Sequence, residues 1–276
     1  MRLATHQLGD RTIATVDTGS GPRCAGAASV DELLRQDDWR AAARRAAEEG
    51  EALPPAARPL APIRAPGKVL CCGLNYRAHI EEMGRGVPEV PTFFAKWADT
   101  LVGPEADVAL AAGDTTKLDW EAELAVVVGA DLRRASVAEC AAAIAGYTVS
   151  NDVSLRDRQW ATTQWLSGKA WDATTPVGPV VVTTDAFDPA EHVVTCRVDG
   201  ETVQHAPLDD LLFPPAELLH HASLFTRLRP GDLVLTGTPA GVGAGRDPQR
   251  FLSDGQVLET EISGIGLLRN TIRIRA

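Results

Sequence analysis

The feature that most constrains this chain is an apolar run, residues 118–129, that carries two glutamates. It reads LDWEAELAVVVG, with Glu121 and Glu123 one residue apart. The run predicts a strand, and side chains two apart on a strand share a face, so the carboxylates should lie about 6–7 Å apart at the backbone. Two acids facing an apolar sheet need a cation, and oxygen ligands suit Mg²⁺, Mn²⁺ or Ca²⁺. The alternative is a solvated edge strand that carries two acids.

Composition limits the class of protein. The 276 residues suffice for one large domain, or for a medium domain with a small appendage. A net charge of −10, with no basic stretch to offset it, argues against nucleic acid or a membrane as a partner. The five cysteines form no CxxC pair, and we find no signal peptide or long apolar run. These features predict reduced thiols and a cytoplasmic location.

A proline-rich stretch divides the chain. Residues 1 to about 50 hold one strand candidate and an Ala/Arg/Glu-rich helix. Prolines then follow at positions 54, 55, 59, 62 and 66, too closely spaced for a helix or a central strand. We therefore predict a small N-terminal α+β module with its linker over residues 1–63, and a main domain over residues 64–276.

The main domain is predicted to be rich in strands. Strand-like runs do not alternate regularly with helices, so a mixed α/β, mainly β architecture fits better than a doubly wound parallel sheet. Asp199-Gly200 predicts a two-residue hairpin. Ser136 and Glu139 form a capping-box pattern that opens an Ala-rich helix closing at Gly146. A second helix is predicted from Ala216 to Phe225.

Further candidate site residues follow the glutamates. Asp152 ends another strand-like run, where an acid is more often a turn or cap residue. Arg156 and Gln159 lie four and seven residues later, so a helix after Asp152 would place them on roughly one face with it. Lys169 follows a glycine in Ser-Gly-Lys. On its own, this lysine is most simply a solvated turn residue.

Two other segments carry chemically useful residues. His79 and Glu82 are three residues apart on a probable helix, so the carboxylate can orient the imidazole, although a helix surface also holds such pairs. The segment 237–245, GTPAGVGAG, fits neither GxGxxG nor the Walker pattern, which argues against a nucleotide loop. Such a loop can still present N–H groups and a hydroxyl to a carboxylate.

Seven blocks of sequence, in this order, strongly resemble the fumarylacetoacetate hydrolase family. They are GLNYRAHIEEMG (73–84), FFAKW (93–97), DWEAELAVVVG (119–129), GYTVSNDVSLRDRQ (146–159), SGK (167–169), PGDLVLTGTPAGVG (230–243) and SGIGLLRN (263–270). The resemblance covers about residues 64–276 and implies the family's β-roll as a catalytic domain. No function transfers to the N-terminal module.

The resemblance also implies roles for particular residues. A Mg²⁺ or Mn²⁺ ion, with Ca²⁺ as a further option, would be held by Glu121, Glu123 and Asp152. The catalytic residues would be His79 and Glu82, as an acid–base dyad on a segment that orders when substrate binds, and Lys169. The substrate-binding residues would be Arg156, Gln159, Gly237 and Thr238. Family members are usually homodimers, so we expect a homodimer.

The activity that the resemblance implies is metal-dependent chemistry on a small 2-oxo acid. We expect a hydrolase that cleaves a carbon–carbon bond in an acylpyruvate, giving pyruvate and a carboxylic acid. The metal would act as a Lewis acid, the dyad would activate water, and Lys169 would offset developing charge. The alternatives are an isomerase or tautomerase of 2-hydroxy-diene-dioates, an oxaloacetate decarboxylase, and a catalytically idle binding homologue.

Overall fold

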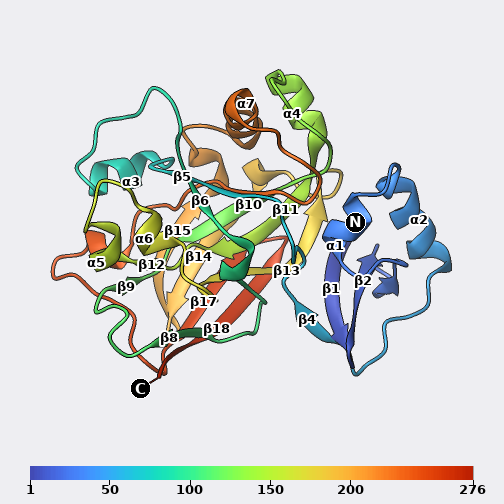
Figure 1. Cartoon of the computed structure of the whole chain (residues 1–276), viewed down its shortest axis with the longest axis horizontal. Helices are drawn as coiled ribbons and strands as arrows, with labels where there is room; N and C mark the ends of the chain where they lie inside the picture. The colour runs from blue at the N-terminus through green and yellow to red at the C-terminus, as the bar shows by residue number, and fades with distance from the viewer. Residues whose placement is uncertain (276) are drawn as a thin grey trace.

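The computed structural model describes residues 1–275, and its centre consists of two large β-sheets (Figure 1). The strands are β1 (Arg2–Leu8), β2 (Arg11–Asp17), β3 (Arg23–Cys24), β4 (Arg58–Leu60), β5 (Val69–Gly73), β6 (Thr92–Lys96), β7 (Leu101–Val102), β8 (Val108–Ala111), β9 (Leu118–Asp119), β10 (Ala122–Val128), β11 (Ile144–Asn151), β12 (Ser154–Leu155), β13 (Thr175–Thr183), β14 (Val193–Val198), β15 (Glu201–Pro207), β16 (Leu233–Leu235), β17 (Val257–Ile262) and β18 (Gly266–Arg275).

Helices are fewer and lie around the sheets. They are α1 (Val30–Leu34), α2 (Trp39–Glu49), α3 (Arg77–Glu82), α4 (Val137–Ala143), α5 (Arg156–Gln159), α6 (Leu166–Lys169) and α7 (Pro215–Phe225). Short 3-10 turns are η1 (Ala98–Thr100), η2 (Pro189–Glu191), η3 (Leu208–Asp210) and η4 (Gly243–Gly245). The predicted mixed α/β, mainly β fold class is confirmed.

The two sheets enclose the main hydrophobic core. The larger sheet has the order β3-β2-β1-β13-β11-β10-β16-β5-β6, and the smaller one β15-β14-β17-β18-β8. Alternate residues of β10 serve two cores because side chains alternate along a strand. Leu124 and Val126 join the core that includes β14 and β17. Ala125 and Val127 join a second core shared with the N-terminal elements. The central strand is therefore buried along its whole length.

The N-terminal strands extend the larger sheet. β1 pairs antiparallel with β13, with Arg2 opposite Val182, and β4 from the proline-rich stretch pairs with β1. Helices α1 and α2 contribute Leu33 and Trp39 to the second core. In Figure 1 these blue elements lie to one side of the molecule, away from α3, α5 and α6.

Most local predictions agree with the structure, and two boundaries differ. β14 and β15 form the hairpin around Asp199-Gly200, and α7 covers the second predicted helix. The capping box of Ser136 and Glu139 is present, but α4 ends at Ala143 rather than Gly146, because Ile144 already begins β11. The predicted run 118–128 is also interrupted, since Trp120 and Glu121 lie between β9 and β10.

No helix within residues 1–275 is long and apolar enough to cross a membrane.

Candidate active site

Three acids from two neighbouring strands meet at one point. Glu121 immediately precedes β10, Glu123 lies within it, and Asp152 immediately follows β11. The strands pair with Ala122 opposite Asn151, and the Asp152 N–H donates to the Glu121 carbonyl at 2.8 Å. One oxygen from each carboxylate lies within 4.8 Å of the others, and all three residues are buried. The three acids that the sequence singles out therefore form one cluster.

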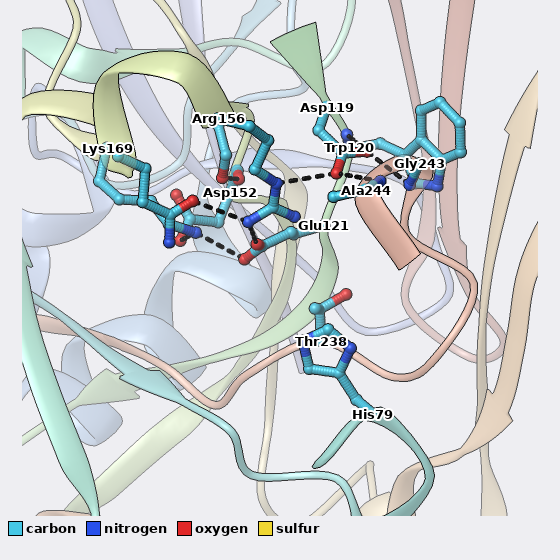
Figure 2. A network of polar contacts seen from close by, with 12 residues as sticks. His79, Asp119, Trp120, Glu121, Asp152, Arg156, Lys169, Thr238, Gly243 and Ala244 are labelled. Carbon is cyan, nitrogen blue, oxygen red and sulfur yellow. Dashed lines mark hydrogen bonds and ion pairs between the residues drawn. The ribbon is translucent and has the colours of Figure 1, made fainter. Parts of the chain in front are cut away.

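Buried cations balance this cluster (Figure 2). Lys169 Nζ bridges Glu121 Oε2 at 2.7 Å and Asp152 Oδ2 at 2.8 Å. Lys96 Nζ donates to Asp152 Oδ1 at 2.5 Å, and Arg156 Nη1 lies 2.7 Å from Glu121 Oε1. Because the carboxylates are shielded from water, these charge-assisted contacts replace hydration that burial removes.

The pKa values of the two glutamates are shifted in opposite directions. Burial opposes the charged form of both. For Glu121, Lys169 and then Arg156 outweigh burial and lower its pKa to about 2. For Glu123, burial and the like charges of Asp152 and Glu121 raise its pKa well above the usual value, although the Gly237 N–H donates to it at 2.7 Å. Glu123 is thus the acid that most needs another cation.

The donor set fits a hard divalent ion. All three clustered side chains offer carboxylate oxygens, the ligands that Mg²⁺, Mn²⁺ and Ca²⁺ prefer. A cation near Glu123 would also offset the repulsion that raises the pKa of that carboxyl. Glu121, Glu123 and Asp152 are therefore the residues that could hold a metal ion.

His79 lies on the opposite wall of a small pocket. Its Nδ1 is 2.9 Å from Glu82 Oε2, and Glu82 Oε1 accepts the Gly241 N–H at 2.9 Å. The pocket has a volume of about 70 Å³. Its lining residues include His79, Glu121, Arg156, Gln159, Lys169 and Thr238. Six of the predicted site residues therefore face one space.

The remaining predicted residues stand behind that wall. Glu82 and Asp152 contact the lining residues His79 and Lys169 without lining the pocket themselves. Glu123 accepts the Gly237 N–H, and neither of these two residues lines the pocket. Thr238 Oγ1 donates to the Ala122 carbonyl at 3.0 Å and accepts from Gln204 Nε2 at 2.8 Å. The roles assigned to Gly237 and Thr238 stay predictions.

Three further residues at the site were missed by the sequence reasoning. Lys96 holds Asp152, Arg85 lines the pocket, and Asp119 accepts the Arg156 Nε–H at 2.8 Å. Asp119 stands two residues before Glu121 in the same run, and Lys96 belongs to the FFAKW block. Asp119 and Lys96 lie within the quoted blocks and Arg85 directly follows one. This position was the available signal, because the contacts of all three residues depend on the tertiary fold.

The fold and the site together define the class of protein. It is a mainly β protein in which buried cations balance a carboxylate cluster beside a small pocket. A family model described as Fumarylacetoacetate (FAA) hydrolase C-terminal matches residues 68–273. The chain belongs to the fumarylacetoacetate hydrolase family, which confirms the resemblance of its sequence blocks.

Individual relatives agree on the family and differ in activity. Oxaloacetate tautomerase FAHD2A, mitochondrial, of Bos taurus is 41% identical over 216 residues, covering 77% of this chain and 68% of that protein. A fumarylacetoacetate hydrolase from psychrophilic Exiguobacterium antarcticum is 33% identical over both whole chains, with a TM-score of 0.88. A 5-carboxymethyl-2-hydroxymuconate delta-isomerase from Mycobacterium smegmatis, also 33% identical over both whole chains, has a TM-score of 0.81. The chain is thus similar to enzymes that act on small molecules.

Proposed function

We propose that this protein is a divalent-metal-dependent enzyme that interconverts the keto and enol forms of a small 2-oxo diacid of the oxaloacetate type. The observation that carries the proposal is the pocket that His79 shares with Glu121, Arg156 and Lys169. A base thus faces cationic groups across a space suited to an anion. The name of the bovine relative favours tautomerisation over the hydrolysis expected from the sequence.

The size of the pocket supports a compact substrate. Its volume of about 70 Å³ is far below the roughly 300–1,000 Å³ of sites for drug-sized ligands. Arg85, Arg156 and Lys169 bring positive charge to its wall, against one lining carboxylate, Glu121. A short acid with two carboxylates matches both properties.

The chemistry requires a proton to leave the carbon next to the keto group. A bound divalent ion would supply Lewis acidity toward the oxygens of the 2-oxo acid. His79 accepts the proton from carbon while Glu82 holds its Nδ1 side, and the imidazolium then returns this proton to the keto oxygen as the enol forms. Lys169 and Arg156 offset the negative charge that develops on that oxygen. The reverse transfers restore the keto acid.

Acylpyruvate hydrolysis, the reaction expected from the sequence, is the second candidate. The His79–Glu82 pair favours it because a paired imidazole can also deprotonate water. The hydroxide adds to the distal carbonyl, the carbon–carbon bond breaks, and the released carbanion takes up a proton to give pyruvate and a carboxylic acid. Decarboxylation of oxaloacetate and isomerisation of a diene-dioate need the same groups. The name of the Mycobacterium smegmatis isomerase supports testing the isomerisation as well.

One assay panel separates these reactions. Oxaloacetate enol, an acylpyruvate and a 2-hydroxy-diene-dioate are each offered with Mg²⁺, with Mn²⁺ and with chelator. We expect loss of the enol absorbance to be fastest, to require metal, and to proceed without release of pyruvate. Faster pyruvate formation from the acylpyruvate would replace tautomerisation with hydrolysis, and no metal-dependent turnover of any substrate would favour an idle homologue.

The base is tested by His79→Ala, with His205→Ala on β15 as the matched control. Loss of a general base should lower kcat by roughly 10²–10⁴-fold. Mn²⁺ affinity should be unchanged, because His79 has no hydrogen bond to the three acids. Equal kcat values in both variants would remove His79 from the mechanism.

Two broader proposals accompany the activity. We propose that residues 64–276 carry the chemistry, since the candidate site lies within them, and that residues 1–63 serve as an accessory module. A cytoplasmic location also remains a proposal, and the name of the bovine relative places that protein in mitochondria. Fractionation of cells that produce the tagged chain tests it.

A further inference from the structure

The glycine-rich segment 237–245 binds acids of the protein itself. Four of its backbone N–H groups donate to side-chain carboxylates: Gly237 to Glu123 at 2.7 Å, Gly241 to Glu82 at 2.9 Å, and Gly243 and Ala244 to Asp119 at 2.7 and 3.0 Å. Backbone N–H groups in such a turn are fixed partial positive charges. The segment therefore links acids that stand on different sides of the pocket.

Asp119 makes the densest set of these contacts (Figure 2). Its side chain is fully buried. Oδ1 accepts the N–H groups of Trp120 at 2.9 Å and Gly243 at 2.7 Å. Oδ2 accepts those of Ala244 at 3.0 Å and Arg156 Nε at 2.8 Å. With both oxygens used twice and no water between them, the carboxylate is held in one orientation.

One side of Asp119 leads to the acid cluster. Arg156, fixed through Nε, places Nη1 2.7 Å from Glu121 Oε1 and 2.9 Å from Gln159 Oε1. Among residues 1–275 its buried Nη2 has no hydrogen-bond partner, so Nε and Nη1 make its hydrogen bonds there. Asp119 therefore helps to orient Glu121 through one guanidinium, while Lys169 binds the other Glu121 oxygen.

The other side leads to the dyad. The segment held by Asp119 also holds Glu82 through the Gly241 N–H, and Glu82 holds His79. Two glycines make this approach possible. A Cβ at position 243 would lie 2.7 Å from Asp119 Oδ1, and one at position 245 would lie 2.7 Å from Glu82 Oε1. Gly243 and Gly245 thus leave room for Asp119 and Glu82, and Gly243 also leaves room for the Arg250 carbonyl, which a Cβ would meet at 1.8 Å.

We propose that Asp119 is a positioning residue that joins the two halves of the site. It sets Glu121 through Arg156, and it sets the His79–Glu82 pair through the segment 241–245. Only the turnover measurement depends on the proposed function. Metal affinity and hydrogen-exchange protection can be measured without a substrate, and they test the positioning role directly.

Asp119→Asn is the direct test. The amide keeps the size of the side chain, but its NH₂ group cannot accept a hydrogen bond, so one pair of donors loses its partner whichever way the amide turns. The matched control is Asp157→Asn on α5, whose side chain binds Thr115 and Thr116 outside the pocket. Mn²⁺ binding by calorimetry, hydrogen exchange and kinetics are measured for both.

We expect Asp119→Asn to lower Mn²⁺ affinity by roughly 10–100-fold, as for other residues that orient metal ligands. Hydrogen-exchange protection should fall in residues 237–245 and also in 77–83, which Asp119 does not touch. kcat should fall by roughly 10²-fold, with a smaller change in KM, because the groups are misplaced rather than removed. Asp157→Asn should resemble the wild type.

A second variant separates the two sides. Gly245→Ala crowds Glu82 without touching Asp119, so it should lower kcat and leave Mn²⁺ affinity unchanged. If Asp119→Asn does not fold, Arg156→Lys, which lacks the Nε donor, must show the Mn²⁺ loss instead.

Unchanged Mn²⁺ affinity together with unchanged protection at 77–83 in Asp119→Asn would overturn the proposal. A uniform loss of protection along the chain would also overturn it, by making Asp119 a residue of general stability. Failure of the wild type to turn over any 2-oxo acid would reject the proposed function, while the binding and exchange results would still decide this inference.

Discussion

Glu121 and Glu123 are the same residue type two positions apart, yet their surroundings give them opposite properties. Glu121 faces Lys169 and Arg156, which hold its pKa at about 2 despite burial. Glu123 is buried beside two other acids, and its pKa is raised well above the usual value. One carboxylate is thus an ion-pair partner, while the other favours its neutral form without a metal ion.

This contrast predicts different stabilities for two matched variants. Glu121→Gln leaves Lys169 and Arg156 short of a buried counter-charge, so the free energy of unfolding should fall by roughly 3–5 kcal/mol. Glu123→Gln removes a carboxylate whose charged form burial and its acidic neighbours disfavour, and it keeps an acceptor for Gly237, so it should cost less stability than Glu121→Gln. Urea unfolding in the absence of metal compares them. Equal losses would contradict the assigned charges. Both variants should bind Mn²⁺ more weakly.

The raised pKa of Glu123 also predicts how metal affinity depends on pH. Below its folded pKa the carboxyl holds a proton, which a metal ion must displace. Mn²⁺ affinity should therefore rise with pH until that pKa is passed, with release of about one proton per ion. Calorimetry in buffers of different ionisation enthalpy measures the release. Glu123→Gln should release none, and proton release equal to the wild type in that variant would place the proton elsewhere.

Folding without metal has the opposite dependence on pH. The folded pKa of Glu123 lies above its unfolded value, which is near 4.3. The folded state then binds more protons than the unfolded state between those two values. The free energy of unfolding therefore falls as pH rises through that window. In Glu123→Gln this part of the pH dependence should disappear.

At the scale of elements, the sequence predicts best where the signal is local. The capping box of Ser136 and Glu139 and the Asp199-Gly200 turn satisfy their backbone groups within a few residues, and both are present. The end of α4 is different. Ile144 to Gly146 follow an Ala-rich stretch that favours a helix. Their backbone instead pairs with β10 and β13, which are other segments of the chain. Sheet pairing therefore overrides local propensity there.

The candidate site divides in the same way. Glu121, Glu123 and Asp152 were found because each is an acid attached to an apolar run. Asp119 and Lys96 also make buried hydrogen bonds at the site. Their partners, Gly243 and Asp152, are 124 and 56 residues away in the sequence. Neither partnership produces a periodic pattern in the sequence. Only the fold brings these groups together.

The segment containing α3 is predicted to act as a lid. Residues 77–91 carry His79, and beyond α3 they include Val87 and Val90, whose side chains are 59% and 62% exposed. Few apolar side chains anchor this stretch, so its backbone should be only partly protected from exchange without ligand. Oxalate plus Mg²⁺ should raise hydrogen-exchange protection in 77–91 and little elsewhere, as the segment closes. Complete protection in the free protein would rule out the lid.

At the scale of the whole molecule, net charge conceals the character of the pocket. The chain carries a net charge of −10, yet Arg85, Arg156 and Lys169 line the candidate site. The acidic total predicts that nucleic acid is not a partner, but it does not predict repulsion of an anionic substrate. Local cations in a low-dielectric cleft determine the field that a small acid meets.

The last prediction concerns assembly. The large hydrophobic side chains that are exposed all lie beyond residue 64, among them Trp97 at 54% and Phe225 at 59%. Exposed apolar side chains of this size favour an interface, so we expect a homodimer formed through the main domain, with twice the 29.3 kDa mass of one chain.

Light scattering after size exclusion measures the mass across a dilution series. Trp97→Glu and Phe225→Glu, made separately, should include one variant that dissociates, while Arg44→Glu on α2 serves as the control. A monomeric wild type at micromolar concentration, or dissociation caused only by Arg44→Glu, would refute the prediction.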